Sequence, residues 1–211
     1  MAIGTLVIAR HHESVWNKMG KWTGTRNVGL TEYGLEASYK MGELIKDIHI
    51  DQAFISSQIR TFQTYSQMIM AMGQSNVSVR ESSALNERDY GDYTGKNKWE
   101  MKELLGVEQW EHVRRGWDVP VPHGETLKMV YQRAVPFYLH TILPVLKEGK
   151  NVLMVSSGNA IRSITKYIED ISDEDIQNLE MLFGGILIYQ VDEEGRMIKK
   201  EIRQIKSHVN A

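Results

Sequence analysis

The chain has 211 residues, of which 42% are hydrophobic and 25% charged, a balance that indicates a folded globular protein and excludes disorder. Its formal net charge of −2 favours neither nucleic acid nor an anionic membrane as a partner, and the absence of cysteine excludes disulfides and a cysteine nucleophile. The apolar run at residues 3–9 is too short to span a bilayer and lacks the flanks of a secretion signal. We therefore expect a cytoplasmic protein, with a single domain over residues 1–211.

Short apolar runs and one final edge segment have the length and composition of β-strands. They lie at residues 5–9, 53–56, 77–80, 151–156, 185–191 and 198–205. Continuous apolar runs of this length are typical of strands covered on both faces, as in parallel sheets. Because helical patterns separate them, the sequence predicts βαβ units and a three-layer α/β/α sandwich with a mostly parallel central sheet. Ligands of such sheets bind beyond the carboxyl ends of the strands.

Three helices are expected between these strands. Thr31 is a suitable N-cap for the first, which should run to about residue 46. In the second, apolar residues recur at spacings of three and four on one face: Phe62, Tyr65, Ile69 and Met72. The third is a long helix with kinks or breaks expected at Pro136 and Pro144, and it is marked by Leu127, Val130, Ala134, Phe137 and Tyr138.

The segment from about residue 85 to residue 125 is rich in Tyr, Trp, Gly and charged residues and has no sustained strand periodicity. Long segments of this kind often cover a binding site, so we expect a cap made of helices and loops. The histidines form no recognisable metal-ligand motif with carboxylates, so no metal is expected. Most of them are expected to be ordinary surface or cap residues: His49, His112, His123, His140 and His208.

Arg10 and His11 end the first apolar run. A neutral imidazole is a competent nucleophile toward phosphorus, and an adjacent guanidinium can neutralise phosphoryl oxygens. Such a pair alone is a weak signal, but further blocks follow it in order. They are Arg10-His11-x-Glu13-Ser14-x-Trp16-Asn17-Lys18, Thr23-Gly24, Gly29-Leu30-Thr31-Glu32-x-Gly34, Ser56-x-x-x-Arg60-x-x-x-Thr64, Leu85-Asn86-Glu87-Arg88-x-Tyr90-Gly91-Asp92, Arg114-Arg115-Gly116-Trp117 and Gly124-Glu125-Thr126-Leu127.

From about residue 5 to residue 192, these blocks resemble the 2,3-bisphosphoglycerate-dependent phosphoglycerate mutases of the histidine phosphatase superfamily. The resemblance implies a phosphoglycerate mutase-like fold and an isomerase of glycolysis and gluconeogenesis. Its activity would be the interconversion of 3-phosphoglycerate and 2-phosphoglycerate through a phosphohistidine. It implies 2,3-bisphosphoglycerate as the phosphoryl primer and no metal. The partners would be small-molecule phosphoglycerates, with no nucleic acid and no membrane, and the assembly would be a homodimer.

The resemblance also assigns roles to individual residues. His11 would accept the phosphoryl group, Arg10 and Arg60 would bind its oxygens, and Glu87 would be the acid and base for the substrate hydroxyl. A structural alternative for Glu87 is a salt bridge with Arg88. The remaining phosphate, hydroxyl and carboxylate groups would be bound by Ser14, Asn17, Thr23, Gly24, Tyr90, Lys98, Arg114, Arg115, Gly158 and Asn159.

Two positions depart from the family pattern. His12 stands where the family has glycine, and Ser157 stands where it has a second histidine that contacts the phosphoryl group. A charge-assisted hydrogen bond from histidine contributes about 1.5–3 kcal/mol, against about 0.5–1.5 kcal/mol for a neutral one from serine. Losing one preorganised donor typically costs roughly 10²–10³ in rate, so reduced activity is expected. His12 should face away from the site that His11 serves, because neighbouring side chains of an extended chain point to opposite faces.

These departures leave two alternatives to a slow mutase. One is a catalytically degenerate protein that binds phosphoglycerates or a partner, because the carboxylate-binding blocks are intact while the phosphoryl pocket is changed. The other is a slow phosphatase, whose looser pocket would admit water to the phosphohistidine.

Overall fold

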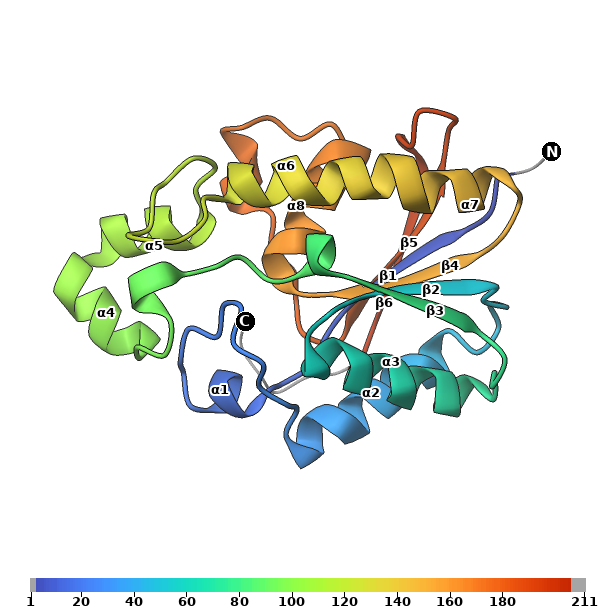
Figure 1. The fold of residues 1–211 in the computed structure, drawn as a ribbon, viewed down its shortest axis with the longest axis horizontal. Helices are drawn as coiled ribbons and strands as arrows, with labels where there is room; N and C mark the ends of the chain where they lie inside the picture. Colours follow the sequence, from blue (N-terminus) through green and yellow to red (C-terminus); the bar gives the residue numbers. More distant parts are fainter. Residues whose placement is uncertain (1–2, 206–211) are drawn as a thin grey trace.

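The computed structural model describes residues 3–205, so His208 lies outside the described residues. Within this range the chain forms a six-stranded sheet in the order β3-β2-β4-β1-β5-β6 (Figure 1). The strands are β1 (Leu6–Arg10), β2 (Gln52–Ser56), β3 (Ser78–Ser82), β4 (Val152–Ser156), β5 (Gly185–Val191) and β6 (Met197–Gln204). Strands β1 to β4 are parallel to one another, whereas β5 runs antiparallel to both β1 and β6. The predicted mostly parallel sheet and its edge strand β6 are confirmed.

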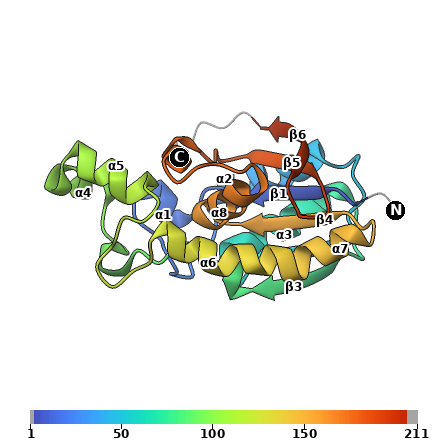
Figure 2. The same cartoon turned by 90° about the horizontal axis from the view of Figure 1, so that it is seen from above.

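Helices cover both faces of the sheet, as the views in Figures 1 and 2 show. They are α1 (Val15–Lys18), α2 (Glu32–Leu44), α3 (Ile59–Met72), α4 (Lys98–Leu105), α5 (Val107–Arg115), α6 (Leu127–Phe137), α7 (Leu143–Lys147) and α8 (Gly158–Ile168). Short 3₁₀ turns occupy η1 (Ser83–Leu85), η2 (Gly91–Tyr93) and η4 (Asp175–Asn178), and η3 (Tyr138–Ile142) is a π-helical turn. No helix within residues 3–205 is long and apolar enough to cross a membrane.

The central strand β1 shows why the sheet is covered on both sides. Leu6 and Ile8 pack into the core beneath α6 and α8, whereas Val7 and Ala9 pack into the core beneath α2 and α3. All four side chains are fully buried, because successive residues of a strand point to opposite faces. The side chains of this apolar run therefore pack into both hydrophobic cores, which gives the expected three-layer arrangement.

The first helices form largely where they were predicted. Thr31 caps α2 by accepting a hydrogen bond from the Gly34 amide at 3.0 Å, and the helix ends at Leu44, two residues before the expected end. A glycine is needed where α2 meets α3, because a Cβ on Gly42 would lie 2.4 Å from the carbonyl oxygen of Met68. This close contact joins the two helices on one face of the sheet.

At Pro136 and Pro144, where kinks or breaks are expected, the helix is not interrupted but changes its pitch. Pro136 lies inside α6, which continues into the π-helical turn η3, and Pro144 lies in the first turn of α7. Proline has no backbone N–H to donate, and the wider turn that follows accommodates the lost hydrogen bond. The three segments continue as one rod along the sheet (Figure 1).

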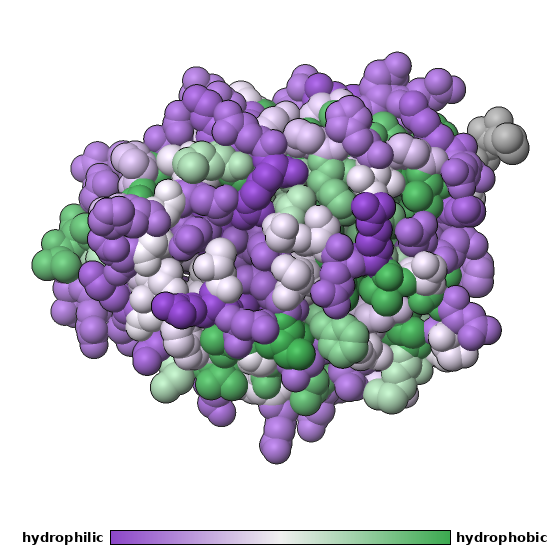
Figure 3. Space-filling model, in the orientation of Figure 1, coloured by the Kyte–Doolittle hydropathy of each residue, from purple (hydrophilic) through white to green (hydrophobic). Residues whose placement is uncertain are grey.

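On the face seen in Figure 3, hydrophilic residues dominate and hydrophobic ones gather in small groups. One such group lies over α3, where Ile59, Phe62 and Met70 are exposed. The prediction that Phe62 lies on the buried face of this helix is therefore wrong. Four histidines expected at the surface are exposed: His49, His112, His123 and His140.

The cap between residues 85 and 125 consists of helices and loops, as predicted, and projects from one end of the sheet (Figure 1). It has an apolar cluster of its own, which includes Trp22 and Trp110. Arg88 is fully buried beside this cluster, and its guanidinium donates to the backbone carbonyls of Val113 at 2.7 Å, Val119 at 3.1 Å and Glu125. One cation thus joins three separate turns of the cap.

Replacing Arg88 by methionine should destabilise the protein by about 2–4 kcal/mol, because three buried carbonyls lose charge-assisted hydrogen bonds. Urea unfolding followed by tryptophan fluorescence measures this loss. The control is Arg80→Met at an exposed position of β3, where the same substitution should change the free energy of unfolding by less than about 0.5 kcal/mol. Equal effects of the two substitutions would contradict the role given to Arg88.

Candidate active site

A polar pocket opens between the carboxyl end of β1 and the cap. It is lined by Arg10, His11, Asn17, Lys21, Trp22, Thr23, Gly24, Arg60, Glu87, Tyr90, Lys98, Arg114, Arg115, Gly158, Asn159, Arg162, Leu179, Glu180 and Met181. Of the residues to which the sequence assigned a catalytic or binding role, only Ser14 is missing from this lining. Its hydroxyl instead caps α1, accepting from the Asn17 amide at 3.2 Å and donating to Asn17 Oδ1 at 2.7 Å. Ser14 therefore orients a lining residue.

His11 is held in one tautomer. Its Nδ1 lies 2.7 Å from the carbonyl oxygen of His12, which can only accept, so Nδ1 carries the proton and Nε2 keeps its lone pair. Arg60 Nε donates to Nε2 at 3.2 Å. Burial and the charges of Arg60 and Arg10 hold the pKa of His11 well below its ordinary value. The ring is therefore neutral at neutral pH, as a nucleophile requires.

Arg60 is fixed by its surroundings. Its Nη1 donates to the carbonyl of Arg26 at 2.9 Å, and its Nη2 donates to the carbonyl of Gly24 at 2.9 Å and to Gln58 Oε1 at 2.8 Å. The whole side chain is buried. The guanidinium is consequently oriented before any ligand arrives, which reduces the cost of reorganisation during reaction.

Four buried hydrogen-bonding groups on the pocket lining have no partner within residues 3–205. They are Arg10 Nε, Trp22 Nε1, Thr23 Oγ1 and Arg162 Nε. A buried polar group without a partner costs about 1–3 kcal/mol, so such groups need an explanation. The Nη1 atom of Arg10 donates to the carbonyl of Met181, and the Arg10 guanidinium lies 3.9 Å from the Phe183 ring centroid. All four unpartnered groups can donate, so the pocket suits a ligand rich in acceptors.

Glu87 is positioned by the main chain around it. Its Oε1 accepts from the amides of Arg88 at 2.7 Å and Asn159 at 3.2 Å. The alternative salt bridge to Arg88 is not supported, because that guanidinium is directed into the cap. The amide of Asn159, at the start of α8, therefore binds a carboxylate of the protein itself.

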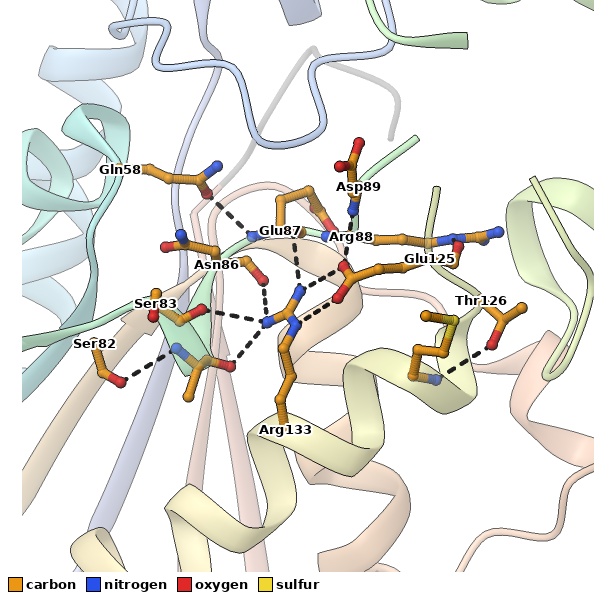
Figure 4. Close-up of polar contacts among 12 residues, drawn as sticks. Gln58, Ser82, Ser83, Asn86, Glu87, Arg88, Asp89, Glu125, Thr126 and Arg133 are labelled. Carbon is orange, nitrogen blue, oxygen red and sulfur yellow. Dashed lines mark hydrogen bonds and ion pairs between the residues drawn. The ribbon is translucent and has the colours of Figure 1, made fainter. Parts of the chain in front are cut away.

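Arg133 of α6 holds the backbone on either side of Glu87 in place (Figure 4). It makes a two-pronged contact with Glu125, with both N–O distances at 2.8 Å, and donates to the carbonyls of Ala84, Asn86 and Glu87. Such fork-shaped contacts are directionally strict. The sequence does not predict a role for Arg133, because the local pattern around Arg133 does not distinguish it from a solvated helix residue.

A second chain of contacts orients Tyr90. Asn159 Nδ2 donates to the Tyr90 hydroxyl at 2.8 Å, and Asn159 Oδ1 accepts from Arg162 Nη1 at 3.0 Å. Burial raises the pKa of Tyr90, so its hydroxyl keeps a proton that it can donate toward the pocket. Arg162 also donates to the carbonyls of Arg115 at 2.7 Å and Ile176 at 2.8 Å, which ties the cap to α8.

The pocket carries a strong positive charge. In the described part of the chain, cationic lining residues outnumber acidic ones by seven to two: Arg10, Lys21, Arg60, Lys98, Arg114, Arg115 and Arg162 against Glu87 and Glu180. Burial, with the charges of Arg10 and Arg114, lowers the pKa of Lys98 to about 8. Lys21, Trp22, Arg162, Leu179, Glu180 and Met181 had been given no role from the sequence. No group of three or more His, Asp or Glu side chains within residues 3–205 is placed to hold a metal ion.

His12 and Ser157, the two expected departures from the family pattern, have different surroundings in the structure. His12 is buried against Tyr33 and Phe183, with ring centroids at 5.3 and 5.6 Å, and does not line the pocket, as expected. Its φ is not positive, so the side chain does not strain the loop. Burial and the charge of Arg10 lower the pKa of His12 to about 4, so the ring is neutral at neutral pH.

Ser157 is also buried, and its hydroxyl lies 3.3 Å from Gln58 Oε1. The same oxygen accepts from Arg60 Nη2 at 2.8 Å and from the Glu87 amide at 3.1 Å, while Gln58 Nε2 donates to the Gly24 carbonyl at 3.1 Å. The Gln58 carboxamide therefore joins Arg60 and the Glu87 amide to Ser157, at the position where the resemblance implies a second histidine. No local sequence pattern singles out this glutamine.

The chain is similar in sequence to proteins of known family. Residues 6–202 match the family model of the histidine phosphatase superfamily, branch 1. A 2,3-bisphosphoglycerate-dependent phosphoglycerate mutase from Parvibaculum lavamentivorans is 38% identical over 199 residues, covering 93% of this chain and 95% of the relative.

Solved structures share the fold at lower identity. A phosphoglycerate mutase from Bacillus anthracis superimposes with a TM-score of 0.78 at 20% identity, over 97% of this chain and 93% of the other. A mycobacterial glucosyl-3-phosphoglycerate phosphatase gives a TM-score of 0.78 at 17% identity, over 97% and 98%. The matched family model and the 38% identical relative each cover most of the sequence, and together they establish that the chain belongs to the histidine phosphatase superfamily.

Proposed function

We propose that this protein interconverts 3-phosphoglycerate and 2-phosphoglycerate through a phosphohistidine at His11. The observation that carries the proposal is the neutral His11 ring, whose Nε2 lone pair lies beside Arg60 in a pocket with a large excess of cations. A phosphate monoester alone would not need so many positive charges, whereas a bisphosphorylated three-carbon acid carries several negative ones. The names of the 38% and 34% identical relatives, phosphoglycerate mutases, point to the same substrates.

The residues of the pocket support a two-step phosphoryl transfer. 2,3-Bisphosphoglycerate supplies the phosphoryl group that primes the protein. His11 Nε2 attacks phosphorus, so a P–N bond forms while the P–O bond to the glycerate breaks, and the Glu87 carboxyl group protonates the departing oxygen. In the return step Glu87 takes the proton from a substrate hydroxyl, whose oxygen attacks phosphorus and restores neutral His11. Arg10 and Arg60 neutralise the charge on the phosphoryl oxygens in both steps.

The other lining residues bind the rest of the substrate. Tyr90, Lys98, Arg114 and Arg115 come from the cap and provide donors for a carboxylate and a second phosphate. Asn17, Thr23, Gly24 and Gly158, which come from outside the cap segment, also line the pocket. We also propose that the enzyme works as a homodimer in the cytoplasm, as the family resemblance implies.

An enolase-coupled assay with and without 2,3-bisphosphoglycerate should detect primer-dependent turnover that His11→Ala abolishes. Incubation with labelled bisphosphate should also leave acid-labile phosphate on the chain. The matched control is His123→Ala, an exposed cap histidine whose loss should leave both signals unchanged.

The alternatives give different results in the same experiments. Thermal stabilisation by phosphoglycerate without turnover or acid-labile phosphate would indicate a binding protein and end the mutase proposal. Phosphate release from 2,3-bisphosphoglycerate that exceeds mutase flux would indicate a phosphatase.

Binding of 2,3-bisphosphoglycerate should weaken as pH rises through about 8. The lowered pKa of Lys98 means that its charge is present below about pH 8 and lost above it, while phosphate groups, with a second pKa near 6, are already ionised. Calorimetric Kd values should rise roughly tenfold between about pH 7.5 and 9.5. Lys98→Arg should flatten this profile, because arginine stays protonated throughout. A profile that is equally steep in Lys98→Arg would assign the titration to another group.

Gln58→Leu should lower kcat roughly 10²-fold, with a smaller change in KM. The substitution removes the oxygen that positions Arg60 and the Glu87 amide. A small displacement of either catalytic group lowers the rate strongly. Ser157→Ala is the comparison, since it removes only the longest of the three contacts to that oxygen. Steady-state measurements of kcat and KM for both variants test this expectation. If Ser157→Ala proves more damaging than Gln58→Leu, the serine hydroxyl itself serves the phosphoryl group.

A further inference from the structure

The segment between η4 and β5 forms one side of the pocket. Leu179, Glu180 and Met181 contribute to the lining. The carbonyl of Met181 accepts from Arg10 Nη1, and the ring of Phe183 lies against the Arg10 guanidinium at 3.9 Å. This segment is therefore held directly against one of the two arginines nearest His11.

Within this segment, Glu180 brings a carboxylate to a pocket otherwise dominated by cations. Its Oε1 lies 2.9 Å from Arg115 Nη2. Arg115 meets a second carboxylate, Glu111 Oε2, at 3.2 Å from its Nε. The two acids are similarly exposed, at 47% for Glu180 and 42% for Glu111. Their positions relative to the pocket differ. Glu111 lies on α5, one turn before Arg115, and does not line the pocket. Glu180 comes from a segment distant in the sequence and lines the pocket.

The charge of Glu180 reaches beyond its direct partner. Burial lowers the pKa values of Arg10 and Arg114, and Glu180 is among the groups that oppose this lowering. One carboxylate thus stabilises the charge of three pocket cations. Any anionic group that enters at Arg115 meets the repulsion of this carboxylate and competes with it for the same N–H donor.

We propose that Glu180 is an internal counter-anion that occupies the outer anion subsite at Arg115 and is displaced by the second anionic group of a ligand. It lowers affinity for ligands with two anionic ends, which shortens their residence and makes Glu180 a specificity-determining residue of the pocket. The competition follows from the charges alone. Only the identity of the natural ligand as a bisphosphorylated acid rests on the proposed function.

The test compares Glu180→Gln with Glu111→Gln, each of which removes one negative charge from Arg115. Isothermal titration with 2,3-bisphosphoglycerate should give a Kd about fivefold lower for Glu180→Gln, the size expected for a partly exposed ion pair. Glu111→Gln should stay within about twofold of the unaltered protein, because its carboxylate does not occupy the pocket. Glutamine keeps a hydrogen-bond acceptor for Arg115, so the segment retains its anchor.

Titration with inorganic tripolyphosphate repeats the comparison without relying on recognition of a phosphoglycerate. Tighter binding of tripolyphosphate to Glu180→Gln, with no binding of the bisphosphate to any form, would support the counter-anion and defeat the proposed function. Unchanged or weaker binding of both ligands to Glu180→Gln would overturn the counter-anion, whatever the enolase-coupled assay shows. Equal tightening in Glu111→Gln would also overturn it, since a general change of charge would then explain the effect.

Discussion

The candidate site depends on the hydrogen bond from His11 Nδ1 to the carbonyl of the next residue in the chain. This contact fixes the tautomer, so that Nε2 is the nitrogen left with a lone pair, and it fixes the ring plane at the end of β1. Burial between two guanidinium groups then keeps the ring neutral. Without the fixed tautomer, the same burial would hide an imidazole whose lone pair pointed at a carbonyl oxygen.

Several arginines build the surroundings of this ring through hydrogen bonds to the protein itself. Arg88 joins turns of the cap, Arg162 joins the cap to α8, and Arg133 holds the backbone around Glu87. Backbone carbonyls accept most of their N–H groups, so the desolvated charge is offset by charge-assisted hydrogen bonds. The remaining lining cations can then face a ligand, on a framework whose geometry is already set.

Ser157, at the position where the resemblance implies a second histidine, lies in a different setting in the folded chain than the sequence suggests. A substitution that removes a donor should leave space and an unsatisfied anion subsite, yet Ser157 is buried against the Gln58 carboxamide. That carboxamide binds Arg60 and the Glu87 amide. A neutral carboxamide therefore links Ser157 with Arg60 and the Glu87 amide.

The sequence by itself determined the strands, three of the helices, the cap and thirteen of the nineteen residues that line the pocket, because apolar runs, capping residues and the motif blocks are local in the chain. It misjudged Phe62, since the buried stripe of α3 runs through Thr61, Tyr65 and Met68, and a neighbouring residue on a helix lies about 100° away. Only the tertiary structure decided the partners of Gln58, Arg133 and Glu180. Their contacts join segments roughly 30 to 100 residues apart, and no local pattern encodes which distant carbonyl or guanidinium a buried polar side chain will meet.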